Sequence, residues 1–217
     1  MTTTRPLRVL LADDETLFRH TIRDLINATP GMTVVTEATT GREAVTLAAA
    51  HRPDVVLMDV RMPDLDGIAA TERITAAIPA PQVLVLTTFD LDDHVYWAMR
   101  AGASGFVLKD ITPSRLLDAI HAVAAGEALL APSVTRRLIA ASLRRSGPHR
   151  TLDDVTPRER DVLILVTRGL SNADIEAALH ISRGTLKTHI GSLLTKLRAR
   201  DRAQLVIAGY EAGLADN

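Results

Sequence analysis

The 217-residue sequence contains no cysteine, and aromatic residues make up only 3% of it. Disulfide bonds and Cys-ligated metal sites are therefore excluded. Apolar residues make up 47% of the chain, so any core must be built from Leu, Val, Ile and Ala. No uncharged apolar run approaches the roughly 18 residues that a membrane span needs. The first apolar stretch, Val9–Ala12, stops at Asp13 and is too short for a signal peptide. We expect a soluble, cytoplasmic protein with no membrane partner.

Charge is unevenly distributed along the chain, although the formal net charge is −1. Residues 1–135 carry 11 Lys and Arg against 17 Asp and Glu, whereas residues 136–150 carry five arginines and no acid. Five more basic residues and no acidic one lie between Ala177 and Arg200. An acidic front and a locally basic back predict two domains with different partners, although a basic helix can also be merely solvated.

Short apolar runs alternate with helical patterns over the front of the chain, which is typical of βαβ units around a parallel sheet. Helical patterns lie near residues 15–28, 41–51, 67–78, 92–101 and 113–125. Met32–Thr36 alternates between apolar and polar residues, as an edge strand does. Four other runs are almost continuously apolar, as buried parallel strands are. These runs are Val9–Ala12, Val55–Met58, Val83–Leu86 and Phe106–Leu108.

Polar side chains follow each of the four buried runs. They are Asp13-Asp14, Asp59, Thr87-Thr88 and Lys109, in chain order. Ligands of open α/β sheets bind outside the carboxyl ends of the strands, so we expect these groups to converge on one small surface. Taken singly, such residues are more often helix caps, turns or surface charges. Their coincidence at four strand ends is what favours a site.

Three clustered carboxylates repel one another, and a divalent cation such as Mg²⁺ relieves that repulsion. A metal beside Lys109 and Thr87 would make a receptacle for a phosphoryl group. Asp59, which comes from the central strand, is the predicted nucleophile and would form an aspartyl phosphate. No glycine-rich phosphate loop is present, which argues against the nucleotide-binding version of this fold.

Residues 7–126 resemble the receiver domain of two-component response regulators in the order and spacing of their motifs. The matching segments are Leu11–Glu15, Asp54–Pro63, Asp64–Gly67, Leu86–Phe89 and Gly102–Asp110. The resemblance implies a doubly wound, flavodoxin-like α/β fold with a five-stranded parallel sheet of order 2-1-3-4-5. It also implies a sensor histidine kinase as the phosphoryl donor.

The same resemblance assigns roles to individual residues. Asp59 would be the phosphoacceptor and Lys109 would pair with a phosphoryl oxygen. Mg²⁺ would be held by Asp14, Asp59 and the backbone carbonyl of Arg61, with Asp13 acting largely through water. Thr87 would carry the switch hydroxyl, and Phe106, at the aromatic switch position, would rotate into the space that the Thr87 loop vacates. Thr88 is bulkier than the alanine common after the switch residue, which leaves the lifetime of the phosphoryl group open.

Residues 127–152 are predicted to form a linker with a short helix at Ser133–Leu143 and a flexible point at Ser146–His149. The arginines of this segment either contact DNA phosphates or simply keep the linker soluble.

Capping signals predict three successive helices after the linker. Thr156, Pro157 and Glu159 form a capping box that opens the first helix, which ends at Gly169. Ser171–Asp174 opens a second helix in the same manner. Ser182 can cap a third helix that runs to about Arg198. Two short helices joined by so brief a turn match the helix-turn-helix pattern.

The third helix has two contrasting faces. Leu186, Ile190, Leu193 and Leu197 form the predicted buried stripe. The opposite face is short or basic, as reading the major groove of DNA requires. It consists of Lys187, Thr188, Gly191 and Thr195, with His189 and Ser192 on its flanks. Basic residues at the helix end suit DNA phosphates, although each alone is commonly a surface charge. They are Lys196, Arg198, Arg200 and Arg202.

The predicted second domain spans residues 153–217, and it resembles the LuxR-type helix-turn-helix domain of NarL/FixJ response regulators from about residue 153 to 214. The matching segments are Thr156–Arg160, Gly169–Ile175, Ile181–Ser182, Thr185–Ile190 and Leu193–Leu197. The resemblance implies an all-α domain of four helices, whose last helix, near Arg202–Glu211, helps to pair two such domains. Lys187 and Thr188 match base-contacting positions, whereas Gly191 stands where relatives often carry a side chain that reaches DNA. The predicted DNA contacts are Lys187, Thr188, Thr185, His189, Ser192, Lys196, Arg198 and Arg200.

The chain is thus predicted to be a transcription regulator that is phosphorylated on Asp59, forms a homodimer and binds double-stranded promoter DNA. RNA polymerase would be a partner if it is an activator. Catalysis beyond autophosphorylation from small donors and autodephosphorylation is not expected. An aspartyl-phosphate phosphatase would want an acid two residues after the nucleophile, where Arg61 stands, and a substrate cap. A receiver that works without phosphate would show a broken acid cluster or a missing lysine.

Overall fold

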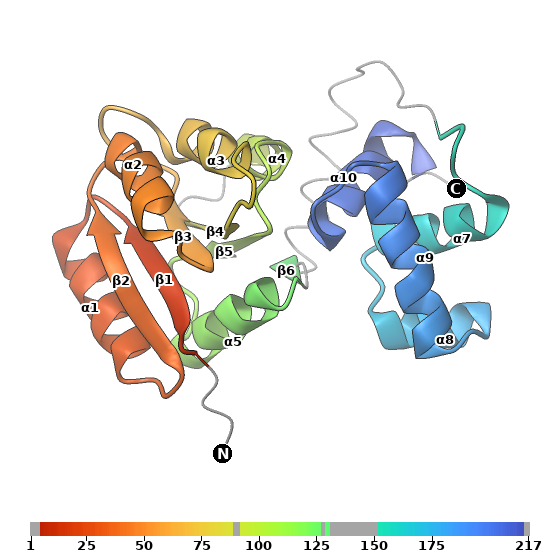
Figure 1. Ribbon diagram of the computed structural model, residues 1–217, viewed down its shortest axis with the longest axis horizontal. Helices are drawn as coiled ribbons and strands as arrows, with labels where there is room; N and C mark the ends of the chain where they lie inside the picture. The colour runs from red at the N-terminus through yellow and green to blue at the C-terminus, as the bar shows by residue number, and fades with distance from the viewer. Residues whose placement is uncertain (1–4, 89–91, 127–128, 131–151, 215–217) are drawn as a thin grey trace. The chain divides into compact units, whose positions relative to one another are not determined.

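The computed structural model describes residues 5–88, 92–126, 129–130 and 152–214 of the chain (Figure 1). The chain divides into two compact units, Met1–Leu129 and Leu130–Asn217. The linker helix predicted at Ser133–Leu143 and the flexible point at Ser146–His149 lie outside the described residues. Within the described ranges, no helix combines the length and apolar character that crossing a membrane requires.

The first unit is built on a parallel sheet whose strands follow the continuously apolar runs. Its five predicted strands are β1 (Leu7–Ala12), β2 (Met32–Ala38), β3 (Val55–Asp59), β4 (Gln82–Thr87) and β5 (Gly105–Leu108). They pair in parallel in the order 2-1-3-4-5, which confirms the predicted topology. A short sixth strand, β6 (Leu129–Leu130), extends the sheet beside β5, in the segment that the sequence assigned to the linker. It pairs with backbone groups that an edge strand otherwise leaves open.

Helices cover both faces of this sheet (Figure 1), which explains why β1, β3, β4 and β5 are almost continuously apolar. α1 (Thr16–Asn27) and α5 (Pro113–Ala124) lie on one face. α2 (Gly41–His51), α3 (Gly67–Thr75) and α4 (Asp92–Arg100) lie on the other. The core on the first face joins the sheet to the two helices. It includes Leu11, Leu57, Leu84, Ile22, Ile26, Leu116 and Ile120.

The described part of the second unit consists of four helices, as the resemblance implies. They are α7 (Pro157–Thr167), α8 (Asn172–Leu179), α9 (Arg183–Lys196) and α10 (Arg202–Glu211). Both predicted capping boxes are present, at Thr156 and Ser171, and the Ser182 side chain accepts a hydrogen bond from the backbone N–H of Thr185. α9 ends two residues before the predicted Arg198, because Arg198 has a φ of +49° that a right-handed helix cannot continue.

The predicted stripe of α9 forms part of this unit's core. Leu186, Leu193 and Leu197 are buried, and the partly buried Ile190 packs against the same cluster. α7 and α10 approach each other closely at Gly209, where a Cβ atom would lie 1.9 Å from Oγ1 of Thr167. The packing of α7 and α10 behind α9 leaves the opposite side of α9 exposed at Lys187, Thr188 and Thr195.

Candidate functional site

Three carboxylates meet at the carboxyl ends of β1 and β3. Asp13 and Asp14 follow β1, and Asp59 is the last residue of β3. Single oxygens of the three side chains lie within 4.8 Å of one another. Asp13 is fully buried and Asp59 is 5% exposed, whereas Asp14 is exposed. The parallel strands thus bring the acids together at one edge of the sheet, with Asp14 at the solvent side.

Lys109, directly after β5, extends into this acid cluster. Its Nζ lies 2.7 Å from Oδ2 of Asp13 and 3.4 Å from Oδ1 of Asp59, and the lysine side chain is only 7% exposed. The backbone N–H of Lys109 donates to the carbonyl of Thr87 at 2.8 Å, which places the end of β4 beside it. Thr87 is itself buried. Three acids and one ammonium are therefore gathered at the ends of β1, β3 and β5, with Thr87 at the end of the neighbouring β4.

The electrostatics of the cluster leave the acids under-compensated. Burial raises the pKa of Asp59 to about 6; the Asp13 charge adds to this rise, while Lys109 opposes it. Three carboxylates around a single ammonium leave negative charge that a cation would neutralise. The donors are all carboxylate oxygens, the ligands that Mg²⁺ prefers, and the exposed Asp14 gives solvent access. The residues present therefore fit a divalent cation.

Two residues that the sequence did not single out hold the acids in place. A Cβ atom on Gly67, the first residue of α3, would lie 1.8 Å from the carbonyl oxygen of Asp59, so α3 can pack here only without a side chain. Arg19 is buried on α1, and its guanidinium donates to the carbonyl of Asp13 at 2.8 Å and to Glu37 at 3.1 Å. Arg19 falls in the helical stripe that includes Ile22 and Ile26, and an arginine within an apolar stripe was the available signal.

Two further predicted residues lie near this cluster in the chain. Arg61 is exposed and stands two residues after Asp59. Phe106 lies within β5, is 1% exposed and is among the largest fully buried side chains. The rotation of Phe106 into the space vacated by the Thr87 loop stays a prediction.

The predicted reading face of α9 is exposed over most of its length. Thr185, Lys187, Thr188, Gly191 and Thr195 are exposed, whereas His189 and Ser192 are partly buried. The Thr188 and Thr195 hydroxyls donate to the carbonyls of Gly184 and Gly191, one helical turn earlier, at 3.1 Å each. Open space surrounds Gly191. The centre of this face is therefore shallow, with Lys187 as its exposed cation.

Two of the predicted DNA contacts, Ser192 and Lys196, bind Glu159 within the domain. Its buried carboxylate accepts hydrogen bonds from the Ser192 hydroxyl at 2.6 Å and the Lys196 ammonium at 2.7 Å, as well as from Thr156. Burial raises the pKa of Glu159, but the hydrogen bonds from Lys196, Ser192 and Thr156 outweigh it and hold the pKa at about 2. Ser192 and Lys196 thus fasten α9 to the start of α7 because a buried carboxylate requires partners.

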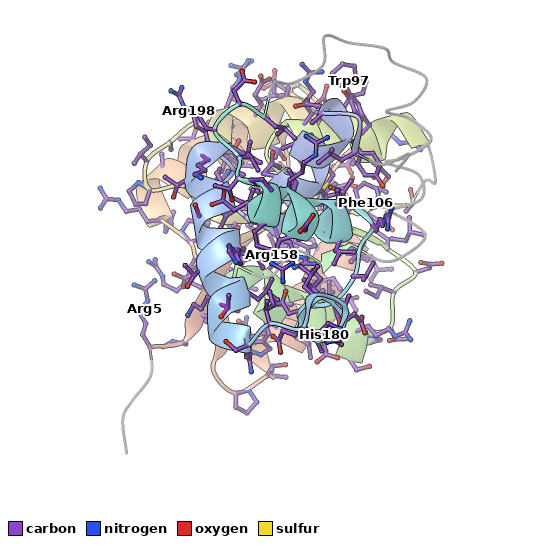
Figure 2. All side chains as sticks on the ribbon, turned by 90° about the vertical axis from the view of Figure 1, so that its right-hand side faces the viewer. Arg5, Trp97, Phe106, Arg158, His180 and Arg198 are labelled. Carbon is purple, nitrogen blue, oxygen red and sulfur yellow. The ribbon has the colours of Figure 1, made fainter. Side chains whose placement is uncertain are left out.

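The remaining arginines at the end of α9 also divide into different environments. Arg200 is half-buried, and burial lowers its pKa. Arg202 donates to Oδ1 of Asn172 at 2.7 Å and to the carbonyl of Leu170, so it ties α10 to the start of α8. Arg198 is exposed just beyond α9 (Figure 2). Of these three arginines, Arg198 is the exposed one.

Comparison with known proteins matches both units. The receiver domain of response regulators matches residues 9–121, and the luxR family of bacterial regulatory proteins matches residues 153–208. These matches define a receiver joined to a LuxR-type DNA-binding domain. The transcriptional regulatory protein YxjL of Bacillus subtilis, described as uncharacterized, is 40% identical over 96% of this chain and 97% of its own length. The nitrate/nitrite response regulator NarL of Escherichia coli K12 is 34% identical over 95% and 96%.

Solved structures agree with this assignment. The crystal structure of ChrA, the response regulator of a heme-sensing two-component system, matches with 34% identity and a TM-score of 0.54. The match covers 97% of this chain and all of ChrA. The chain belongs to the NarL/FixJ family of two-component response regulators, which are phosphorylation-dependent regulators of transcription.

Asp59→Asn should stabilise the receiver unit in a pH-dependent manner. The pKa of Asp59 is about 6 in the folded chain against an ordinary value of 3.8, so its charge costs stability above pH 6 and not below pH 3.8. Urea unfolding in EDTA at pH 7.5 should show a gain of up to about 3 kcal/mol, which shrinks as the pH falls toward 4. An equal gain at every pH would contradict the burial of this charge.

Lys196→Ala should destabilise the DNA-binding unit, because it leaves the buried Glu159 carboxylate without its cation. We expect a loss of about 1–3 kcal/mol in the free energy of unfolding. Arg198→Ala removes an exposed cation and is the matched control, with an expected change within about 0.5 kcal/mol. Equal effects of the two substitutions on thermal or urea unfolding would show that Glu159 does not depend on Lys196.

Proposed function

We propose that Asp59 is the phosphoacceptor of this response regulator, with a sensor histidine kinase or a small donor such as acetyl phosphate as the source. An oxygen of the Asp59 carboxylate forms a bond to phosphorus as the bond between phosphorus and the donor breaks. The leaving group departs with the electron pair. The observation that carries the proposal is the position of Asp59 in the acid cluster, 3.4 Å from the Lys109 ammonium.

Lys109 and Thr87 have electrostatic and signalling roles in this proposal. The ammonium stands where negative charge develops on the phosphoryl oxygens, and such fixed charges lower the barrier to transfer. The Thr87 hydroxyl binds a phosphoryl oxygen and draws its loop inward, which lets Phe106 rotate into the vacated space. Thr87 therefore reports the phosphorylated state rather than performing the chemistry.

We also propose that Asp14, Asp59 and the backbone carbonyl of Arg61 hold Mg²⁺. When bound, the metal supplies positive charge to the phosphoryl oxygens and keeps the acids ionised. Asp13 acts largely through water, because its carboxylate is already paired with Lys109. Asp14 is exposed and free to turn toward the cation.

Phosphorylation should require the Asp59 carboxylate as the acceptor, and Mg²⁺. Asp59→Asn keeps the shape of the side chain but removes its anionic oxygen, so phosphorylation by acetyl phosphate with Mg²⁺ should fall to background. Intact-protein mass spectrometry measures the added phosphoryl mass. Asp118→Asn, at an exposed position on α5, is the control and should be phosphorylated like the parent chain. Undiminished phosphorylation of Asp59→Asn would refute the assignment.

We propose that phosphorylation pairs two copies of the chain so that two α9 helices read inverted half-sites in promoter DNA. Half-site centres would lie about one helical turn, or a multiple of it, apart. Lys187 and Thr188 contact bases, flanked by Thr185 and His189, and Arg198 contacts a phosphate. The regulator binds promoter DNA in the cytoplasm. It contacts RNA polymerase if it is an activator.

Lys187→Ala should lower the discrimination between a specific and a scrambled DNA site by roughly 1–3 kcal/mol, because a base contact is lost. Arg198→Ala should weaken binding to both sites alike, because a phosphate contact carries no sequence information. The phosphorylated proteins are titrated by fluorescence anisotropy against a site selected from random DNA. Equal weakening on both sites by Lys187→Ala would make Lys187 a phosphate contact and place base readout elsewhere.

A further inference from the structure

Lys109 has a third neighbour besides Asp13 and Asp59. Its Nζ lies 4.7 Å from the centroid of the Phe18 ring, within the distance at which an aromatic ring attracts a cation. Phe18 is the third residue of α1, is partly buried and packs against the core of the receiver unit.

An aromatic ring restrains an ammonium without neutralising it. The electron-rich ring face attracts the cation, yet the ring has no net charge. A carboxylate at the same place would compete with Asp59 for the lysine and cancel the charge that phosphoryl oxygens need. An aliphatic side chain would fill the space but would leave that side of the ammonium without electrostatic attraction. Phe18 therefore combines restraint with preserved positive charge.

Restraint matters here because lysine carries its charge on a flexible four-carbon chain. The ammonium lies closer to Asp13, at 2.7 Å, than to Asp59, at 3.4 Å. It can meet phosphoryl oxygens on Asp59 without rearrangement only if it stays between the two acids. Pre-positioned charge is more effective in the transition state than charge that must first be brought into place.

The position of the ring is fixed by its neighbour in α1. Arg19 follows Phe18 and is buried, with its guanidinium bound to the Asp13 carbonyl at 2.8 Å and to Glu37 at 3.1 Å. The same turn of helix thus anchors the acidic loop and places the ring over the lysine. A shift of this turn of α1 relative to the cluster would have to break these contacts.

We propose that Phe18 is a positioning residue for phosphoryl transfer, whose ring holds the Lys109 ammonium in place beside Asp59. The proposal rests on the proposed role of Asp59 as phosphoacceptor. Phe18 does not touch the phosphoryl group and acts through Lys109.

Stepwise fluorination of Phe18 separates electrostatics from shape. Mono-, di- and trifluorophenylalanine drain electron density from the ring face while nearly preserving its size. In the full chain, the rate of phosphorylation by acetyl phosphate at fixed Mg²⁺ should fall with each fluorine. The cumulative loss should be about three- to tenfold. Phe18→Leu should lower the phosphorylation rate by a similar factor. Phe18→Tyr, which keeps the ring, should retain most of the rate.

A Lys109→Ala background provides the matched control. If the ring acts through the ammonium, fluorination should have no effect on the residual rate in that background. A second readout is independent of phosphorylation: ring currents should shift the NMR signals of the Lys109 side-chain methylene protons, and Phe18→Leu should abolish that shift.

The outcomes separate this proposal from the function on which it rests. Equal rates across the fluorinated series, with Asp59 still phosphorylated, would overturn the role of Phe18 and leave Asp59 as the acceptor. A loss in Phe18→Leu without a graded loss on fluorination would reduce Phe18 to a space-filling residue and also overturn the proposal. Phosphorylation of Asp59→Asn at the parent rate would instead overturn the acceptor assignment itself.

Discussion

Three carboxylates at one edge of the sheet repel one another, and the contacts around them in the receiver unit depend on that repulsion. Two of the acids, Asp13 and Asp59, are buried, which makes their charges costly. Neighbouring residues either compensate these charges or hold the acids in position. Lys109 is shared between the buried acids, Arg19 binds the Asp13 carbonyl, and the missing side chain of Gly67 lets α3 pack against Asp59. The negative charge that these contacts do not compensate remains for a cation to neutralise.

The strand ends could be predicted from the sequence because parallel strands place their carboxyl termini at one edge. Continuous apolar runs located β1, β3, β4 and β5, and the polar residue after each run followed directly. β6 was not predicted, because a strand of two residues, Leu129 and Leu130, has no periodic pattern in the sequence. The Lys109–Phe18 contact could not be predicted, because it depends on the rotation of α1 about its axis, which residue spacing alone does not fix.

The DNA-binding unit shows why charge patterns are weaker predictors than apolar ones. The stripe of Leu186, Leu193 and Leu197 was found because burial imposes a helical period. The basic residues after it have no such constraint, and Lys196 and Arg202 turned out to bind within the domain. The capping box already accounted for Glu159 in the sequence. Nothing there indicated that its carboxylate would also accept hydrogen bonds from Ser192 and Lys196, 33 and 37 residues away.

The internal use of these cations affects how ionic strength acts on the regulator. Each DNA phosphate that a protein neutralises releases condensed counterions and adds about −0.9 to the slope of log affinity against log salt concentration. A helix end that keeps Lys196 for Glu159 and Arg202 for Asn172 offers two fewer cations per copy to DNA phosphates. We therefore expect a shallower dependence of affinity on salt concentration than the whole basic cluster would give.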